Sequence, residues 1–173
     1  MKKIILLIIL LIGTENLLAQ KLAVDKVEND GRRILISQDY TFYRDVITGD
    51  YADFNLSCTA VDGKKSFYIY FNICDKYKSV RIDKGKKLLI KLENDSILEL
   101  SNNLSFSKNS SYSLSEEQIE KIVNGKVVKI RIDRNVDMID KEIKKNKFSK
   151  RVKEAYNAII VALQTKKDIY TDF

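Results

Sequence analysis

The feature that most constrains the fold is an alternation of apolar and polar residues on both sides of Asp62-Gly63. Apolar side chains occupy every second position in Phe54–Val61 and again in Ser66–Cys74. An Asp-Gly pair favours the tight turn that joins two antiparallel strands, because such a turn needs positive φ angles. The pattern therefore predicts a long β-hairpin within an antiparallel sheet.

A two-residue turn also fixes the register of this hairpin, because positions whose numbers sum to 125 then face each other. One face receives three apolar pairs and is expected to form core: Phe54 with Phe71, Leu56 with Ile69, and Cys58 with Phe67. The opposite face receives Tyr68, Tyr70, Asn72 and Cys74. A slip by one residue would exchange the two faces, so the register is a strong constraint.

The two cysteines lie on opposite faces in this register. Cys74 is seven positions along the strand from Phe67, the partner of Cys58, and about 3.3 Å per residue puts it beyond disulfide reach. A disulfide is the alternative, because paired cysteines form disulfides in oxidising compartments. The register nevertheless predicts two separate, buried thiols.

Turn signals divide the rest of the chain into further short segments. Asp39–Asp50 is expected to be irregular, held down by Tyr40, Phe42 and Tyr43. Val128, Ile130 and Ile132 alternate with Lys129 and Arg131 in the last expected strand. The other expected strands are Leu22–Glu28 with Arg32–Ser37 around Asn29-Asp30-Gly31, Val80–Asp83 with Lys87–Glu93 around Lys84-Gly85-Lys86, Ile97–Ser101 after Asn94-Asp95, and Lys126–Asp133.

Two helices are expected. Ser115 and Gln118 form a capping box, and Gly125 would end this short helix in the left-handed conformation. A longer helix covers about Lys147–Lys166, because its apolar residues recur at spacings of three and four. Those residues are Phe148, Val152, Ala155, Ile159, Ala162 and Leu163. Asp137–Lys145 is expected to be a separate turn or a helical lead-in.

These elements predict one α+β domain over residues 20–173. Its main part is an antiparallel β-sheet built from hairpins, with one short helix and a C-terminal amphipathic helix packed on the sheet. This arrangement buries the apolar face of the sheet and the apolar stripe of the long helix against each other.

Residues 1–19 have the pattern of a secretory signal peptide. Lys2 and Lys3 precede an apolar run from Ile4 to Ile12, and Ala19 offers a small residue for cleavage. The run is too short for a membrane span, which needs roughly 20 residues. An uncleaved anchor or a first core strand is the alternative, and Leu17 is unusual near a cleavage site. The pattern predicts a periplasmic or secreted protein, and no Cys follows the run, so a lipoprotein is not expected.

Composition excludes several kinds of chemistry. The chain has no His, so it lacks a histidine base and an imidazole metal ligand, and two Cys cannot complete a thiolate zinc site. No cofactor, metal ligand or catalytic residue is predicted. The net charge is +7, and +6 without residues 1–19, which favours anionic partners. An AT-rich coding sequence explains the excess of Lys equally well, and export disfavours nucleic acid.

Two groups of residues are candidate interaction surfaces. Tyr68, Tyr70 and Asn72 share the hairpin face away from the expected core and could stack on sugars or bind a partner protein. The alternative is that a helix covers this face. The second group lies opposite the apolar stripe of the long helix and would bind an anion or form a solvated surface. It consists of Lys147, Lys150, Arg151 and Lys153.

Three segments resemble a known group of proteins: 84–92, 112–119 and 128–132. In these segments the chain is similar to small exported proteins of unknown function that are common in Bacteroidetes. The resemblance is one of pattern and covers about Gly31–Asp133. It implies an antiparallel sheet with a C-terminal helix, and it brings no catalytic residue and no cofactor.

Three hypotheses for function follow, and none identifies a ligand, a partner or an oligomeric state. The first is a non-enzymatic periplasmic or secreted protein that binds a protein or an extracytoplasmic ligand. The second is an exported inhibitor or immunity protein that neutralises a toxin or an enzyme. The third is a hydrolase that uses only carboxylates or Ser/Lys chemistry, which would need a deep cleft with a desolvated carboxylate or lysine.

Overall fold

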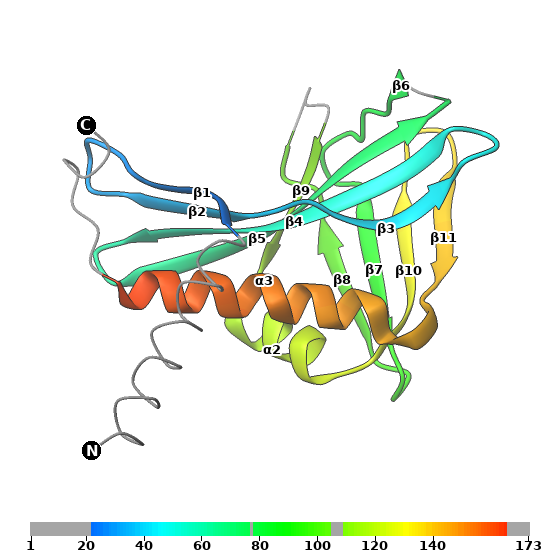
Figure 1. Ribbon diagram of the computed structural model, residues 1–173. Helices are drawn as coiled ribbons and strands as arrows, with labels where there is room; N and C mark the ends of the chain where they lie inside the picture. Colours follow the sequence, from blue (N-terminus) through cyan, green and yellow to red (C-terminus); the bar gives the residue numbers. More distant parts are fainter. Residues whose placement is uncertain (1–21, 77, 105–108, 166–173) are drawn as a thin grey trace, which may run out of the picture.

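The computed structural model describes residues 22–76, 78–104 and 109–165. The predicted signal peptide lies outside these residues, as does Lys166 at the end of the predicted long helix. Two antiparallel sheets contribute to one hydrophobic core. Helices α2 (Glu116–Asn124) and α3 (Lys147–Gln164) both pack on the same face of the larger sheet (Figure 1). The α+β prediction is therefore confirmed. No helix in the described ranges is long and apolar enough to cross a membrane.

The larger sheet is built around the hairpin of its two longest strands, β4 (Asp50–Val61) and β5 (Lys64–Asp75). Strands β2 and β3 pair with the two ends of β4, while β9 and β6 pair with β5. Where β2 gives way to β3, the Ser37 hydroxyl accepts the buried Leu56 N–H at 3.0 Å. The remaining strands of this sheet are β1 (Leu22–Val27), β2 (Arg33–Ser37), β3 (Tyr40–Asp45), β6 (Lys78–Ser79) and β9 (Asn109–Leu114).

The predicted register of the central hairpin is confirmed. Asp62 and Gly63 form the turn with φ angles of 49° and 75°, as a primed two-residue turn requires. The predicted cross-strand pairs all form: Phe54 with Phe71, Leu56 with Ile69, and Cys58 with Phe67. Cys58 and Cys74 are both buried and both free.

The smaller sheet has the strand order β11-β10-β7-β8, formed by β7 (Lys87–Leu92), β8 (Ile97–Ser101), β10 (Val127–Asp133) and β11 (Met138–Glu142). A bulge near the start of β10 puts Val127 in the core. Val128 is only half-buried, so the expected alternation fails at this position. The buried Ser149 hydroxyl of α3 accepts the Val127 N–H at 3.1 Å, which satisfies the backbone at the bulge.

Asn102 joins the two sheets. It follows β8 and forms an isolated bridge with Tyr112 of β9. Its side chain is 1% exposed and makes five hydrogen bonds to backbone groups. The amide donates to the carbonyls of Ile82, Asp83 and Leu104, and its oxygen accepts from the N–H groups of Leu104 and Ser111. Between the two sheets, the Asn102 side chain therefore supplies the backbone hydrogen bonds that a paired strand would otherwise supply.

Three expectations about local structure are wrong. Asp39–Asp50 is not irregular, because β3 forms within it and pairs with β4. Val80–Asp83 is not a strand facing Lys87–Glu93; β7 pairs instead with β8 and β10. Asp137–Lys145 contains strand β11, and only its end enters the short 3₁₀ turn η1 (Lys144–Asn146). Strand β3 was missed because a bulge interrupts its pairing with β4, and β7 was given the wrong partner because it pairs with β8 and with the distant β10.

The predicted capping box of α2 is confirmed. Ser115 accepts from the Gln118 N–H at 3.2 Å, and the Gln118 side chain accepts from the Ser115 N–H at 2.9 Å. The prediction that Gly125 adopts the left-handed conformation is wrong, because its backbone is extended with φ −88°. A Cβ atom at Gly125 would lie 2.5 Å from the Lys121 carbonyl oxygen. Glycine is therefore needed here for space, and not for its backbone conformation.

Helix α3 packs an aromatic cluster against the inner face of the larger sheet. The Phe148 ring lies 4.6 Å from that of Phe54 and 6.4 Å from those of Phe42 and Phe71, between centroids. Seven residues of α3 are buried: Phe148, Ser149, Val152, Ala155, Ala158, Ile159 and Ala162. The predicted apolar stripe is thus confirmed in the core, with Leu163 at its half-buried end.

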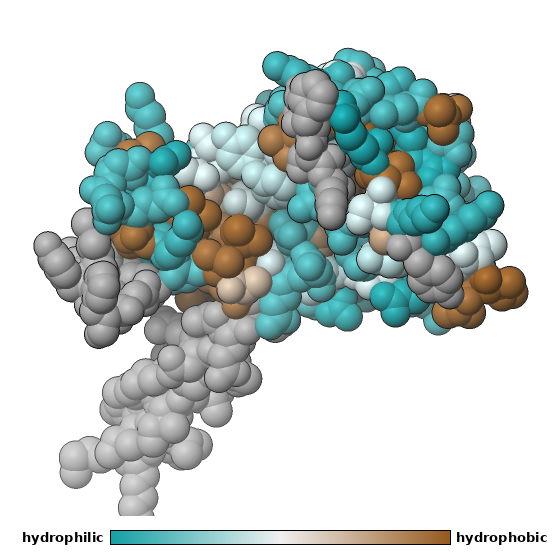
Figure 2. Space-filling model, turned by 90° about the horizontal axis from the view of Figure 1, so that it is seen from above, coloured by the Kyte–Doolittle hydropathy of each residue, from teal (hydrophilic) through white to brown (hydrophobic). Residues whose placement is uncertain are grey.

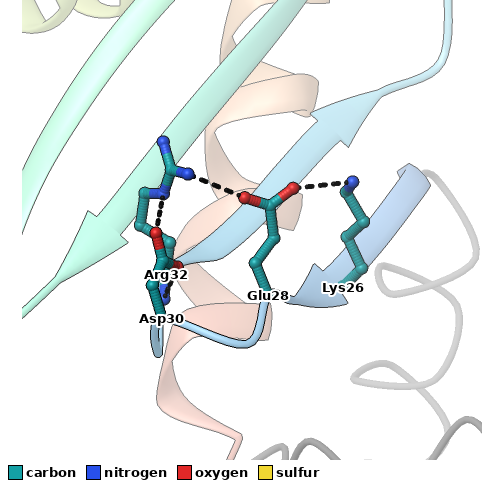
Figure 3. Close-up of polar contacts among 4 residues, drawn as sticks. All are labelled: Lys26, Glu28, Asp30 and Arg32. Atoms are coloured by element: carbon teal, nitrogen blue, oxygen red, sulfur yellow. Dashed lines mark hydrogen bonds and ion pairs between the residues drawn. The ribbon is translucent and has the colours of Figure 1, made fainter.

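The β1–β2 hairpin carries a row of ion pairs at the edge of the larger sheet (Figure 3). Glu28 binds Lys26 and Arg32 at 2.9 Å each, and Arg32 also binds Asp30 at 2.9 Å. Charges on an edge strand discourage pairing with another chain. These exposed pairs add little stability. Only Lys26 lies on the edge strand itself, since Glu28, Asp30 and Arg32 belong to the turn.

Candidate functional site

A pocket of about 550 Å³ opens between β3 and the N-terminal end of α3. Ligand pockets commonly have volumes of about 300–1,000 Å³, so this one has room for a small molecule. Its walls come from segments about a hundred residues apart in sequence, which β3 brings together by pairing with β4.

The floor of the pocket is aromatic. Phe42 of β3, Phe54 of β4 and Phe148 of α3 line it. Phe54 and Phe148 belong to the buried core, Phe42 packs against it, and Tyr43 and Ile143 extend the apolar surface. The rings of Phe42 and Phe148 meet edge to face at 81°, a favourable arrangement for aromatic pairs. Because the core holds these rings in place, the floor is preformed.

The rim of the pocket is cationic. Five basic residues line it against two acidic ones, Glu142 and Glu154, which leaves an excess of three positive charges. We call the basic residues the cationic rim: Arg44, Lys144, Lys147, Lys150 and Arg151. Within the described residues, the three lysines of this rim make no ion pair with an acidic side chain.

Arg151 is the most constrained member of the cationic rim. Its Nη1 donates to Glu154 Oε2 at 2.8 Å, and its guanidinium lies 5.5 Å from the centre of the Tyr40 ring. Burial raises the pKa of the Tyr40 hydroxyl, so that group stays protonated at neutral pH. Lys141 makes a similar contact nearby, with its Nζ 3.8 Å from the centre of the Tyr43 ring.

The backbone at the start of α3 adds to the positive potential of the pocket. The helix has no acidic residue in its first turn, and Asn146 at the N-cap makes no side-chain capping bond. Lys145 and Asn146 both have positive φ, at 56° and 52°, a costly conformation for residues other than glycine. Lysines beside a helix N-terminus repel its dipole, so this end of the helix is electrostatically suited to an anion.

The structure separates the candidate residues of the helix into two groups. Lys147, Lys150 and Arg151 line the pocket, whereas Lys153 is exposed elsewhere on α3. The sequence did not indicate Arg44 or Lys144 as partners of these residues. Arg44 lies on β3, the strand that was expected to be irregular, so its approach to α3 had no signal in the local pattern.

Tyr68, Tyr70 and Asn72 lie on the face of the larger sheet opposite α3. We call this surface the outer face and define it by eleven residues that pair across β4, β5 and β9: Asp53, Asn55, Ser57, Thr59, Ser66, Tyr68, Tyr70, Asn72, Asn109, Ser111 and Ser113. Figure 2 looks onto this side, where a pale, weakly polar area lies among teal hydrophilic and brown apolar groups. Ile34 and Ile36 of β2 continue the same face toward the sheet edge.

Several carboxyl groups among the described residues have shifted pKa values for structural reasons. Lowered pKa values belong to carboxyl groups in exposed turns and ion pairs, held down by hydrogen bonds to backbone N–H groups or to Lys and Arg: Asp30, Asp50, Asp95, Glu117 and Asp140. Burial raises the pKa of Cys58 to about 11 and that of Tyr112 to about 12, both in the core. In the described ranges no three Cys, Asp or Glu side chains are grouped to hold a metal ion.

Comparison with known proteins adds no relative: no protein-family model, no curated protein and no solved structure matches the chain.

Proposed function

We propose that this chain is an exported binding protein whose pocket at the start of α3 holds an anionic ligand with an apolar body. The cationic rim over an aromatic floor carries this proposal. An alkyl or aryl carboxylate fits both parts, because its apolar group can pack on Phe42 and Phe148 while its carboxylate meets Lys147 and Lys150. Residues 1–19 support the export, since they have the charge and apolar pattern of a signal peptide.

Calorimetric titration with laurate and with naphthoate tests the pocket. The wild-type protein should bind at least one of these probes, and dodecanol, which lacks the charge, should bind at least about tenfold more weakly. Raised salt should weaken the binding of the anion, because the rim is exposed to solvent.

Charge reversal locates the site. Lys147→Glu with Lys150→Glu should weaken binding of the anion at least about tenfold. Each of the two single variants should also weaken binding, and Lys153→Glu is the matched control for them, because it reverses one charge on the same helix outside the pocket. Failure of both anions to bind would refute the proposed ligand class, and an equal loss in the Lys153→Glu variant would show a general charge effect and no pocket.

Mass spectrometry of the native protein tests the export. We expect a chain that begins near Gln20 in an envelope or secreted fraction, and an intact Met1 in the cytoplasm would contradict it. A pull-down from the same fraction separates ligand binding from inhibition, since an inhibitor should capture one tight protein partner in a fixed ratio.

A further inference from the structure

We infer that the outer face of the larger sheet is a second binding site, and that it takes a neutral glycan. Tyr68 and Tyr70 supply the surface on which sugar rings stack, and the amides and hydroxyls around them supply hydrogen bonds. The site is on the opposite side of the sheet from the α3 pocket and shares no residue with that pocket, so the two proposals can be tested independently.

No helix covers the outer face in the described structure, although Ser57 and Ser111 at its centre are buried. The expectation that a helix covers it is wrong, because α2 and α3 both lie on the other side of the sheet (Figure 1). The contacts of α3 with β4 are made through inner-face rings such as Phe54. Tyr68, Tyr70 and Asn72 each keep part of their surface in contact with solvent.

The composition of the outer face differs from that of the whole chain. Charged residues make up 32% of the chain, yet Asp53 is the one charged residue among the eleven of the outer face. A merely solvated sheet face in a chain so rich in lysine would be expected to carry several charges. The register puts Arg44 and Lys64 at the two ends of this face, so its centre is uncharged and is suited to an uncharged ligand.

The polar residues of the outer face favour a glycan over a protein partner. Four of the eleven are serines, namely Ser57, Ser66, Ser111 and Ser113. Serine is depleted in protein–protein interfaces, where arginine and large apolar anchors carry the binding energy. Hydroxyl and amide groups around tyrosine rings match the alternating C–H and O–H surfaces of a sugar.

The two tyrosines form a continuous aromatic platform. They are neighbours on one face of β5, with ring centres 6.4 Å apart and planes inclined by 48°. Tyr68 lies between Ser57 and Ser113 on the adjoining strands, and Tyr70 between Asn55 and Ser111. A central strand holds the rings, so little conformational entropy is lost when a ligand binds.

Hydrogen-bonding groups beside this platform are already oriented. The Asn55 amide donates to Asp39 Oδ1 at 2.7 Å, and the Asn103 amide donates to the Ser113 hydroxyl at 2.7 Å. Asn72 and Ser113, which both keep exposed surface, are polar residues beside the platform that a saccharide can approach.

The inference is tested by probing a printed array of neutral and anionic oligosaccharides with the purified protein. Gel retardation in the presence of laminarin, starch or mannan then measures the affinity of the protein for each neutral glycan. Tyr68→Ala and Tyr70→Ala should each weaken binding of a neutral glycan about tenfold, because each removes one of the two rings on which sugars stack; a tenfold change corresponds to about 1.4 kcal/mol. Tyr68→Phe and Tyr70→Phe should retain most of the binding. Tyr43→Ala is the matched control, because that ring belongs to the pocket.

The outcomes separate the two sites. Failure to bind any neutral glycan, or equal binding by the wild type and the double Tyr→Ala variant, overturns the inference. Binding of anionic glycans alone, lost with Lys147→Glu, would assign glycan recognition to the pocket and also overturns it. If the alanine variants do not fold, Asn72→Ala and Ser113→Ala test the same face, and both should weaken binding without lowering the melting temperature.

Discussion

The two faces of the β4–β5 hairpin come from alternate residues of the same two strands, and they differ in every physical respect. The inner face is apolar and at most 1% exposed, with Phe54, Leu56, Phe67, Ile69 and Phe71. The outer face is polar, nearly uncharged and open. The comparison shows that burial on the inner face stabilises the fold, while the outer face contributes little to the core.

The largest effect that tests this division is expected on the inner face. Phe71→Ala should cost about 3–5 kcal/mol of unfolding free energy, because it opens a cavity in a cluster that includes Phe42 and Tyr112. Tyr70→Ala, its neighbour on the outer face, should cost less than about 1 kcal/mol. Urea unfolding of both variants measures the difference, and equal losses would mean that the outer face is also packed.

A large effect is also expected at Asn102, which connects the two sheets. Asn102→Ala should cost at least about 2 kcal/mol, because it leaves several buried backbone groups without partners. Asn103→Ala is the matched control: its side chain is exposed and makes its hydrogen bond to Ser113. Urea unfolding should show almost no change for the control. A small loss in Asn102→Ala would contradict the role of Asn102 as the joint between the sheets.

The reactivities of the two cysteine thiols allow the two faces to be compared. Cys58 lies on the inner face, and Cys74 lies on the opposite face, where it pairs with Tyr51. Cys58 is 0% exposed, and with a pKa of about 11 only about one molecule in a thousand carries its thiolate at pH 8. Mass spectrometry after timed alkylation of the native protein should therefore find Cys74 modified first. Denatured, unreduced protein should titrate as two thiols, and a result of none would disprove the register.

The smallest effect is expected in the charged periphery, at Asp140 of β11. Hydrogen bonds from Arg131 and Lys129 lower the pKa of Asp140 below its usual value of 3.8. A carboxyl group with a lowered folded-state pKa stabilises the fold above its unfolded pKa, and the contribution disappears as the pH falls through the folded pKa. Asp140→Asn should therefore be slightly less stable than wild type at pH 7 and equal to it near pH 2. A difference that persists at pH 2 would contradict this electrostatic origin.

The sequence was sufficient for elements that are set by local patterns. Asp62-Gly63 determined the central hairpin and its register, and Ser115 with Gln118 determined the start of α2. Strand β3 escaped prediction because Thr41 and Arg44 break the alternation and its pairing with β4 involves a bulge. Gly125 was assigned the wrong role, since a glycine required for space has the same sequence signal as one required for a positive φ.

The candidate sites could be predicted only in part, for a similar reason. Tyr68, Tyr70 and Asn72 share a face by strand alternation alone, and Lys147, Lys150 and Arg151 share one by helical spacing. The meeting of Arg44 with this helix, and hence the pocket, depends on the path of β3 across the sheet. The openness of the outer face depends on both helices packing on the apolar face of the sheet. The sequence indicated that side for α3, but it gave no side for α2.

Hydroxyl-radical footprinting of the native protein tests most directly the claim that the helices leave the outer face open. Tyr68 and Tyr70 should be oxidised readily, while Tyr112, which is 0% exposed on the inner side, should be protected until the protein unfolds. Protection of Tyr68 and Tyr70 equal to that of Tyr112 would show that this face is covered, and would contradict the account.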